Sequence, residues 1–257
     1  ATEQGRRQFR ENALQYARRS VEVCKGMNAQ GVIVWSVEGQ EWPHMISYLG
    51  DPRSLPPEMD AVADEFFQVF TDAGLRVGIC IRPQRAVRSA YCQKVFQMNF
   101  PGRLARKRAM MAKIKHARER WGCTLFYLDS NIRWFGDPVR IPGAAGYSAD
   151  MDVQTLAEIM AAFDDVLILP EWEALRSYAC AAPYSGLRHN KLAAPPDRVR
   201  RTYDEAFFVN NIDRKSGAER FDDLVEAVRQ GNILMFPGWY DAKENEIVKN
   251  IYEQAGK

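Results

Sequence analysis

Two acidic side chains stand directly behind apolar runs in this sequence, at Asp129 and at Glu171. The run before Asp129 reads FYL, and the run before Glu171 reads LILP. A pair of carboxyl groups suits nucleophilic and acid–base chemistry when one is ionised and the other holds a proton near neutral pH. Burial against an aromatic ring such as that of Trp172 would raise the pKa of one carboxyl, and an arginine such as Arg82 would keep the other ionised.

Polar groups follow the other strand-like runs as well. Carboxylates follow five of the six runs, and tryptophan follows four. A single carboxylate in this place is more often a helix cap or a turn former, which is our interpretation of Glu41 and Asp213. As a set, however, these groups predict a site for a sugar, which needs polar partners for its hydroxyls and flat aromatic faces for its C–H surfaces. The expected ligand contacts are Glu38, Trp42, His44, Arg82, Asn131, Trp172, Glu173, Asn211, Trp239 and Asp241.

These side chains need a scaffold in which strand ends converge. Apolar residues at three- and four-residue steps predict helices over residues 6–27, 58–73, 102–121, 153–163, 221–229 and 245–252. Short apolar runs predict strands over residues 31–36, 75–81, 123–128, 166–169, 206–209 and 232–236. These runs alternate little, so we expect strands that are buried on both faces, as in parallel sheets.

Alternating strands and helices in a chain of 257 residues predict one α/β domain over residues 1–257. No G-x-G-x-x-G turn follows a strand, so we favour a TIM-type (β/α)8 barrel over a doubly wound sheet. Six strands are clear. A strand before residue 1, and another within residues 177–187 or near a terminus, would complete the barrel. In a barrel all strand ends meet at one face, so the two acids and the expected contacts would converge there.

The order of the two acids resembles that in retaining (β/α)-barrel glycoside hydrolases of the α-amylase-like superfamily. There a nucleophilic Asp ends the fourth strand and an acid/base Glu ends the fifth, the places that Asp129 and Glu171 take if one strand precedes residue 1. FFVNNID is similar to that family's late Asn-His-Asp strand end, although Asn211 and Ile212 stand where Asn-His would be. Tyr127 stands where the family has an arginine.

The resemblance covers strand ends only and matches no single family. It implies that Asp129 is the nucleophile and that Glu171 is the acid/base. It also implies a sugar subsite lined by Glu38, Arg82, Asn131, Trp239 and Asp241.

We therefore predict an enzyme of carbohydrate metabolism, a glycoside hydrolase that cleaves a glycosidic bond, as in polysaccharide degradation, with retention through a covalent intermediate on Asp129. One alternative is a carbohydrate-binding barrel without catalysis. Another is a metal-assisted lyase or isomerase acting on a sugar acid, with Mg²⁺ or Ca²⁺ held by Glu38, Asp129 and Glu171. The sugar, the linkage, the anomeric preference and the oligomeric state are left open.

The bulk composition narrows the partners. The net charge of +2 gives no reason to expect nucleic acid, and we interpret the basic residues within 103–120 as the solvated face of a helix that buries Leu104, Met111, Ile114 and Ala117. No apolar run approaches the ~18–20 residues that span a bilayer, so we expect no membrane partner.

Three histidines, and five cysteines without a Cys-x-x-Cys pair, form no zinc-site pattern, so we predict no metal and no cofactor. The chain begins at Ala1 and not at Met. This is compatible with a soluble protein that is secreted or periplasmic after removal of an upstream segment, and localisation is otherwise left open.

Overall fold

The structure is a computed structural model of the chain, and it describes residues 2–38, 50–88, 95–129, 132–135, 146–149, 151–171, 175–186, 194–207, 209–212, 214–236 and 243–256. Within this part the helices are α1 (Glu3–Gly26), α2 (Pro57–Asp72), α3 (Gly102–Trp121), α4 (Val153–Met160), α5 (Asp197–Arg200), α6 (Arg214–Glu219), α7 (Phe221–Arg229) and α8 (Lys243–Ala255), with a 3-10 helix at Leu175–Ala179.

The strands fall into a parallel set and two antiparallel hairpins. The parallel strands are β1 (Gly31–Val34), β2 (Arg76–Ile81), β5 (Leu125–Leu128), β8 (Leu167–Pro170), β9 (Tyr184–Gly186), β10 (Val209–Asn211) and β11 (Ile233–Met235). The hairpins are β3 (Gln84–Arg88) with β4 (Val95–Asn99), and β6 (Ile132–Phe135) with β7 (Gly146–Ala149). Each hairpin follows the carboxyl end of a parallel strand, β2 or β5.

Local sequence signals explain where several helices begin and end. The Thr2 side chain accepts a hydrogen bond from the backbone N–H of Gly5, and Asp152 accepts one from Thr155, so each caps the start of a helix. Pro57 opens α2, where its missing N–H costs nothing. Gly122 ends α3 with φ 67°, a left-handed conformation that favours glycine.

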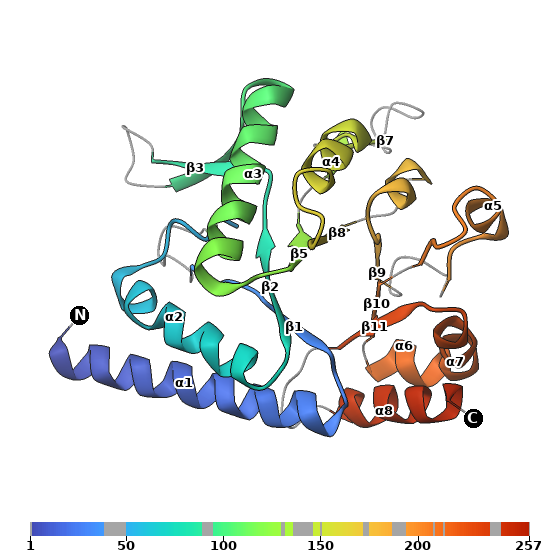
Figure 1. Cartoon of the computed structure of the whole chain (residues 1–257), viewed down its shortest axis with the longest axis horizontal. Coiled ribbons are helices and arrows are strands. Elements are labelled where there is room, and N and C mark those ends of the chain that lie inside the picture. Colours follow the sequence, from blue (N-terminus) through green and yellow to red (C-terminus); the bar gives the residue numbers. More distant parts are fainter. Residues whose placement is uncertain are drawn as a thin grey trace.

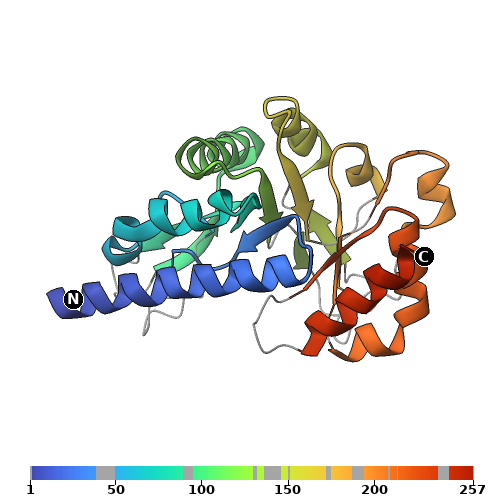
Figure 2. The same cartoon turned by 60° about the horizontal axis from the view of Figure 1, so that its bottom comes forward.

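The parallel strands lie next to one another in chain order. One sheet runs β1-β2-β5-β8, and the other runs β9-β10-β11. A parallel bridge between Glu171 and Tyr184 connects the end of β8 to the start of β9, so the two sheets continue each other. Figures 1 and 2 show the helices around the outside of these strands. A doubly wound sheet reverses its strand order at a switch point, and the described strands do not.

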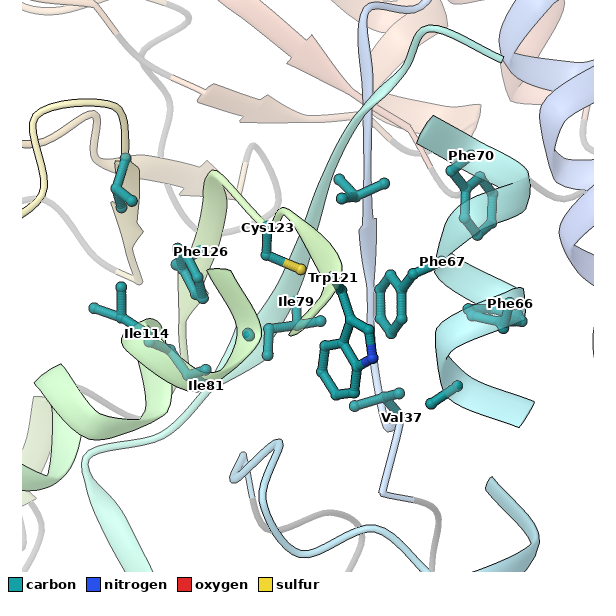
Figure 3. Packing of buried hydrophobic residues seen from close by; sticks show 14 of the residues in the cluster. Val37, Phe66, Phe67, Phe70, Ile79, Ile81, Ile114, Trp121, Cys123 and Phe126 are labelled. Atoms are coloured by element: carbon teal, nitrogen blue, oxygen red, sulfur yellow. The ribbon is translucent and has the colours of Figure 1, made fainter. Parts of the chain in front are cut away.

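The main hydrophobic core lies between the outer helices and the parallel strands. Figure 3 shows Phe67 of α2 beside Trp121 from the end of α3, with Ile79 and Ile81 of β2 beyond the indole. The Phe67 and Trp121 rings stack with their centroids 4.5 Å apart. A second, smaller cluster lies on the other face of the strands and contains Cys80, Tyr127 and Leu169. β2, β5 and β8 are therefore buried on both faces, as their sequence predicts, whereas the residues of β1 are half-buried.

The structure confirms an α/β fold with a parallel sheet. Every predicted helix is present in the described part, within a few residues of its expected ends. The strand expected somewhere within residues 177–187 is β9. A closed barrel is not seen among the described residues, where β1 and β11 are end strands of their sheets.

Three details of the predicted fold are wrong. The fifth strand is expected over residues 206–209 but occupies Val209–Asn211, because the N–H of Ala206 bonds the Tyr203 carbonyl in a turn. The two hairpins were not predicted. Leu104 is 55% exposed although its spacing placed it on the buried side of α3, whereas Lys113 on the same helix is fully buried.

Candidate active site

Arg82, Asp129 and Glu171 lie level with one another at the carboxyl ends of three neighbouring strands. Ile81 of β2 is paired with Leu128 of β5, and Leu128 with Pro170 of β8, so the next residue along each strand falls at the same height. The N–H of Asp129 donates to the Ile81 carbonyl at 3.0 Å, and the N–H of Glu171 donates to the Leu128 carbonyl at 3.0 Å. The pairing thus extends to both acids.

Alternation along the strands decides which way these three side chains point. Cys80, Tyr127 and Leu169 belong to the smaller cluster on the face away from α2 and α3. Arg82, Asp129 and Glu171 lie two residues further along the same strands, and residues two apart in a strand share a face. The three therefore extend from the inner face, directly above that cluster.

The electrostatics of the cluster place both acids near it. Burial raises the pKa of the Tyr127 hydroxyl, and the nearby charges of Glu171, Tyr184 and Asp129, in that order, raise it further. Burial likewise raises the pKa of the Cys80 thiol well above its usual range, with Asp129 as the next cause. With raised pKa values the Cys80 thiol and the Tyr127 hydroxyl stay protonated, so neither is a nucleophile. We therefore treat these two side chains as the floor of the site.

Aromatic rings cover much of this floor. The Trp35 ring lies 4.8 Å from the Tyr127 ring, and Tyr184 meets Tyr127 edge to face at 5.0 Å. Trp35 follows β1 and is 36% exposed, although the indole ring is packed against Tyr127. Ser36, the next residue, has φ 55°, which is uncommon for a residue other than glycine and turns the chain sharply after Trp35. The floor therefore presents an aromatic face to solvent.

Arg82 and Asp129 form an ion pair at the edge of this floor. The Arg82 Nε donates to the Asp129 Oδ2 at 3.0 Å, and Nη2 donates to the same oxygen at 2.7 Å. Their side chains are 12% and 10% exposed, so water screens the pair little. A guanidinium at this distance favours the ionised form of a carboxyl group.

Glu38 is buried close to the same strand ends, but at least one of its oxygens serves the backbone. Its Oε1 accepts a hydrogen bond from the N–H of Asp51 at 3.0 Å. Burial raises the pKa of Glu38, while hydrogen bonds from backbone N–H groups and the charge of Lys113 oppose that rise. This carboxylate therefore anchors the turn that begins at Gly50.

The remaining predicted contacts divide into two groups. Asn211 is the last residue of β10 and lies within the strand, which corrects the expectation that it follows one; it shares a face with Val209 of the smaller cluster. Those outside the described residues are Trp42, His44, Asn131, Trp172, Glu173, Trp239 and Asp241. Their part in a site stays a prediction.

Sequence reasoning missed Trp35, Tyr127 and Tyr184 as parts of the site. The signal for Tyr127 was present, because it lies two residues before Asp129 and so shares its face. The place of Trp35 beside Tyr127 depends on strand pairing, which the sequence does not reveal.

In the described ranges no three His, Cys, Asp or Glu side chains gather closely enough to hold a metal ion. No helix in those ranges is long and apolar enough to cross a membrane.

Comparison with known proteins finds likeness in structure only. No family model matches the sequence, and no curated protein matches it. Among solved structures, a noncanonic maltogenic alpha-amylase from Thermotoga neapolitana is similar, with a TM-score of 0.58 over 95% of this chain and 9% identity. A bacterial fucosidase is similar with a TM-score of 0.50 over 92% of this chain and 11% identity.

This chain spans 72% of that amylase and 59% of that fucosidase. The likeness extends over almost the whole chain, so the arrangement of strands and helices is shared with these two α/β enzymes. At 9% and 11% identity it shows the fold alone.

Proposed function

We propose that this protein is a glycoside hydrolase that uses Asp129 and Glu171 as its two catalytic carboxyl groups. The observation that carries the proposal is their placement at equal height on adjacent parallel strands, above a shared aromatic floor. The two similar structures support it, since one is an amylase and the other a fucosidase.

The spacing supports a retaining reaction. Neighbouring strands lie about 4.8 Å apart, so two side chains at the same height can bring their carboxyl groups within the ~5–5.5 Å typical of retaining enzymes. An inverting enzyme needs about 6.5–9.5 Å, which leaves room for a water molecule between acid and base. Adjacent strands suit the shorter separation better.

The surroundings suggest which acid does what. Arg82 holds Asp129 as an anion, as a nucleophile requires. Glu171 bridges to Tyr184 beside the aromatic floor, and a half-buried aromatic setting favours a protonated carboxyl. In the proposed mechanism Asp129 attacks the anomeric carbon while Glu171 protonates the departing oxygen. Glu171 then takes a proton from water as that water releases the sugar from Asp129.

Trp35 is the aromatic platform for the sugar in this proposal. Its indole faces solvent while it packs on Tyr127, so the C–H surface of a pyranose can lie against it. The predicted contacts outside the described residues, among them Trp172 and Trp239, would complete the subsite from the loops.

The complete scaffold in this proposal is a single-domain (β/α) barrel. The parallel strands keep chain order and enclose a cluster on their inner face, which is how barrel strands are arranged. One further strand between β11 and β1 would close the ring.

The experiment is a screen of aryl glycosides of both anomers with wild-type protein, Asp129→Asn and Glu171→Gln. We expect hydrolysis by the wild type and none by Asp129→Asn. Asp165→Asn is the matched control, because this exposed carboxylate on the outer surface pairs with Arg118. Binding of a sugar without any product would point instead to a carbohydrate-binding barrel. Activity that is lost on chelation and restored by Mg²⁺ would point to the metal-assisted alternative.

A further inference from the structure

We propose that Lys113 is a positioning residue for this site, which holds the backbone at Arg82 and thereby sets the ion pair between Arg82 and Asp129. The inference rests on the proposed function for its catalytic meaning. Its structural part concerns the residues behind the strand ends and depends only on the hydrogen bonds of Lys113 and Gly50.

Lys113 is a fully buried cation on a helix whose other basic residues are exposed or half-buried. It lies in the stripe of α3 that contains Met110, Ile114 and Ala117, all of them part of the main core. Its Nζ donates to the carbonyl of Arg82 at 2.6 Å and to the carbonyl of Gln84 at 2.9 Å. The cation therefore reaches through the core to the chain that leaves β2.

This arrangement has a cost that packing alone does not explain. Burial lowers the pKa of Lys113 to about 8, against the attraction of the Asp51 and Glu38 carboxylates, while Arg53 adds a further unfavourable positive charge. A methionine would fill similar space without a buried charge. The ammonium group of Lys113, in contrast, can hold the carbonyls of Arg82 and Gln84 at a fixed distance from the core.

Gly50 holds Arg82 from the opposite side. The N–H of Arg82 donates to the Gly50 carbonyl at 3.1 Å. Gly50 has φ +59°, and a Cβ on it would lie 2.4 Å from the Arg82 nitrogen and 2.7 Å from the Arg82 Cβ. Only glycine permits this approach. The bond from Glu38 to the N–H of Asp51 fixes the turn that presents Gly50.

Arg82 is thus held at both ends of its backbone unit, by Gly50 at the nitrogen and by Lys113 at the carbonyl. Its guanidinium is held at Asp129. Loss of the bond to the carbonyl would remove one of the contacts that place the Arg82 backbone and let the guanidinium shift from the carboxylate. A misplacement of about 1 Å at such a site can reduce a rate by about 100-fold.

The test uses Lys113→Met, with Lys115→Met on the same helix as the matched control, because Lys115 is exposed and pairs with Glu119. Gly50→Ala is the second variant, since it disturbs Arg82 without touching Lys113. For each protein we measure kcat and KM over pH, the melting temperature, and the titration midpoint of the Asp129 carboxyl by carbon NMR. The groups that face Asp129 in this titration are Arg82, Glu171, Cys80 and Tyr127.

We expect Lys113→Met to reduce kcat about 10- to 100-fold with little change in KM. The acidic limb of the pH–rate profile and the titration midpoint of Asp129 should both move to higher pH. Gly50→Ala should also move the acidic limb and the Asp129 midpoint to higher pH, and Lys115→Met should change neither of these two values. A folded Lys113→Met protein with wild-type kcat and an unchanged Asp129 midpoint would overturn the proposal. If no aryl glycoside is hydrolysed but the midpoint still moves, the positioning role stands and the glycosidase proposal fails.

Discussion

Asp129 and Glu171 lie side by side because β5 and β8 are paired in register up to and beyond their last residues. The N–H of Glu171 bonds the carbonyl of Leu128, the residue before Asp129. Their relative position is therefore fixed by backbone hydrogen bonds of the sheet and does not depend on a flexible loop.

Asp129→Asn should abolish hydrolysis and leave the fold intact. Asparagine has nearly the same shape but is not a nucleophile, so we expect kcat to fall about 10⁴-fold or more. It also leaves Arg82 without its counter-charge at a site where water screens little, which should lower the free energy of unfolding by about 1–3 kcal/mol. Steady-state kinetics and urea denaturation measure the two effects. Substantial turnover by a pure, folded variant would rule out the assigned role.

Glu171→Gln should slow hydrolysis in a way that depends on the leaving group. A substrate whose leaving group needs no proton should still react with Asp129, so the variant should accumulate the covalent intermediate. Azide, which needs no general base, should then restore turnover and give a glycosyl azide. Equal loss for good and poor leaving groups, without rescue by azide, would contradict the acid/base role. Glu119→Gln is a matched exposed control.

Trp35→Ala should weaken substrate binding more than it slows chemistry. The indole offers a flat surface on the floor and no reacting group, so we expect KM to rise by about tenfold with kcat changed only slightly. Tyr16→Ala on α1 is the matched control, because Tyr16 is 39% exposed and Trp35 is 36% exposed. Equal KM values for Trp35→Ala and wild type would remove the aromatic platform from the account.

Arg82→Lys should keep the positive charge but lose the paired hydrogen bonds of the guanidinium to Asp129. Lysine is a point charge, so it cannot reproduce the two donors that Arg82 directs at one oxygen of Asp129. The acidic limb of the rate profile should move to higher pH, because the anion of Asp129 is less well stabilised. An unchanged pH profile would show that the ion pair does not control this ionisation.

The lowered pKa of Lys113 predicts that the free energy of unfolding depends on pH in the alkaline range. Below pH 8 the lysine is protonated in both states, and above its pKa of about 8 the folded protein releases the proton while the unfolded chain keeps it until about pH 10.5. The unfolded state then binds more protons, so the contribution of Lys113 to stability rises with pH across this window, by about 3 kcal/mol at most.

Lys113→Met removes this contribution. Between pH 8 and 10.5 the free energy of unfolding of the wild type should therefore rise relative to that of the variant. Comparing the two proteins cancels the buried thiols, whose raised pKa values act in the opposite direction. A difference that stays constant across this pH range would show that Lys113 is not a buried cation.

The sequence predicts the helices well because helical periodicity, proline at a helix start and glycine at a helix end are local signals. Pro57 and Gly122 mark their helices in this way. The hairpins were missed because they depend on pairing between segments that carry no strong apolar pattern. The fifth strand was misplaced because it includes Asn210, which is fully buried despite being polar.

The sequence also predicts that Asp129 and Glu171 end neighbouring strands, but it does not reveal their register or the residues that support them. Lys113 looks like one more basic residue on a solvated helix. Its burial follows from its place between Met110 and Ala117, in a stripe that faces β2. Sequence spacing alone could have flagged that stripe. The two carbonyls it bonds become visible only once the chain after β2 is placed.

Trapping the covalent intermediate tests most sharply whether Asp129 is the nucleophile. A 2-deoxy-2-fluoro glycosyl fluoride of the sugar found in the aryl glycoside screen is incubated with the protein, and the labelled peptide is identified by mass spectrometry. We predict one added sugar per protein on the peptide that contains Asp129, and none on Asp129→Asn. A label on a different residue, or a product of inverted anomeric configuration with no label at all, would contradict it.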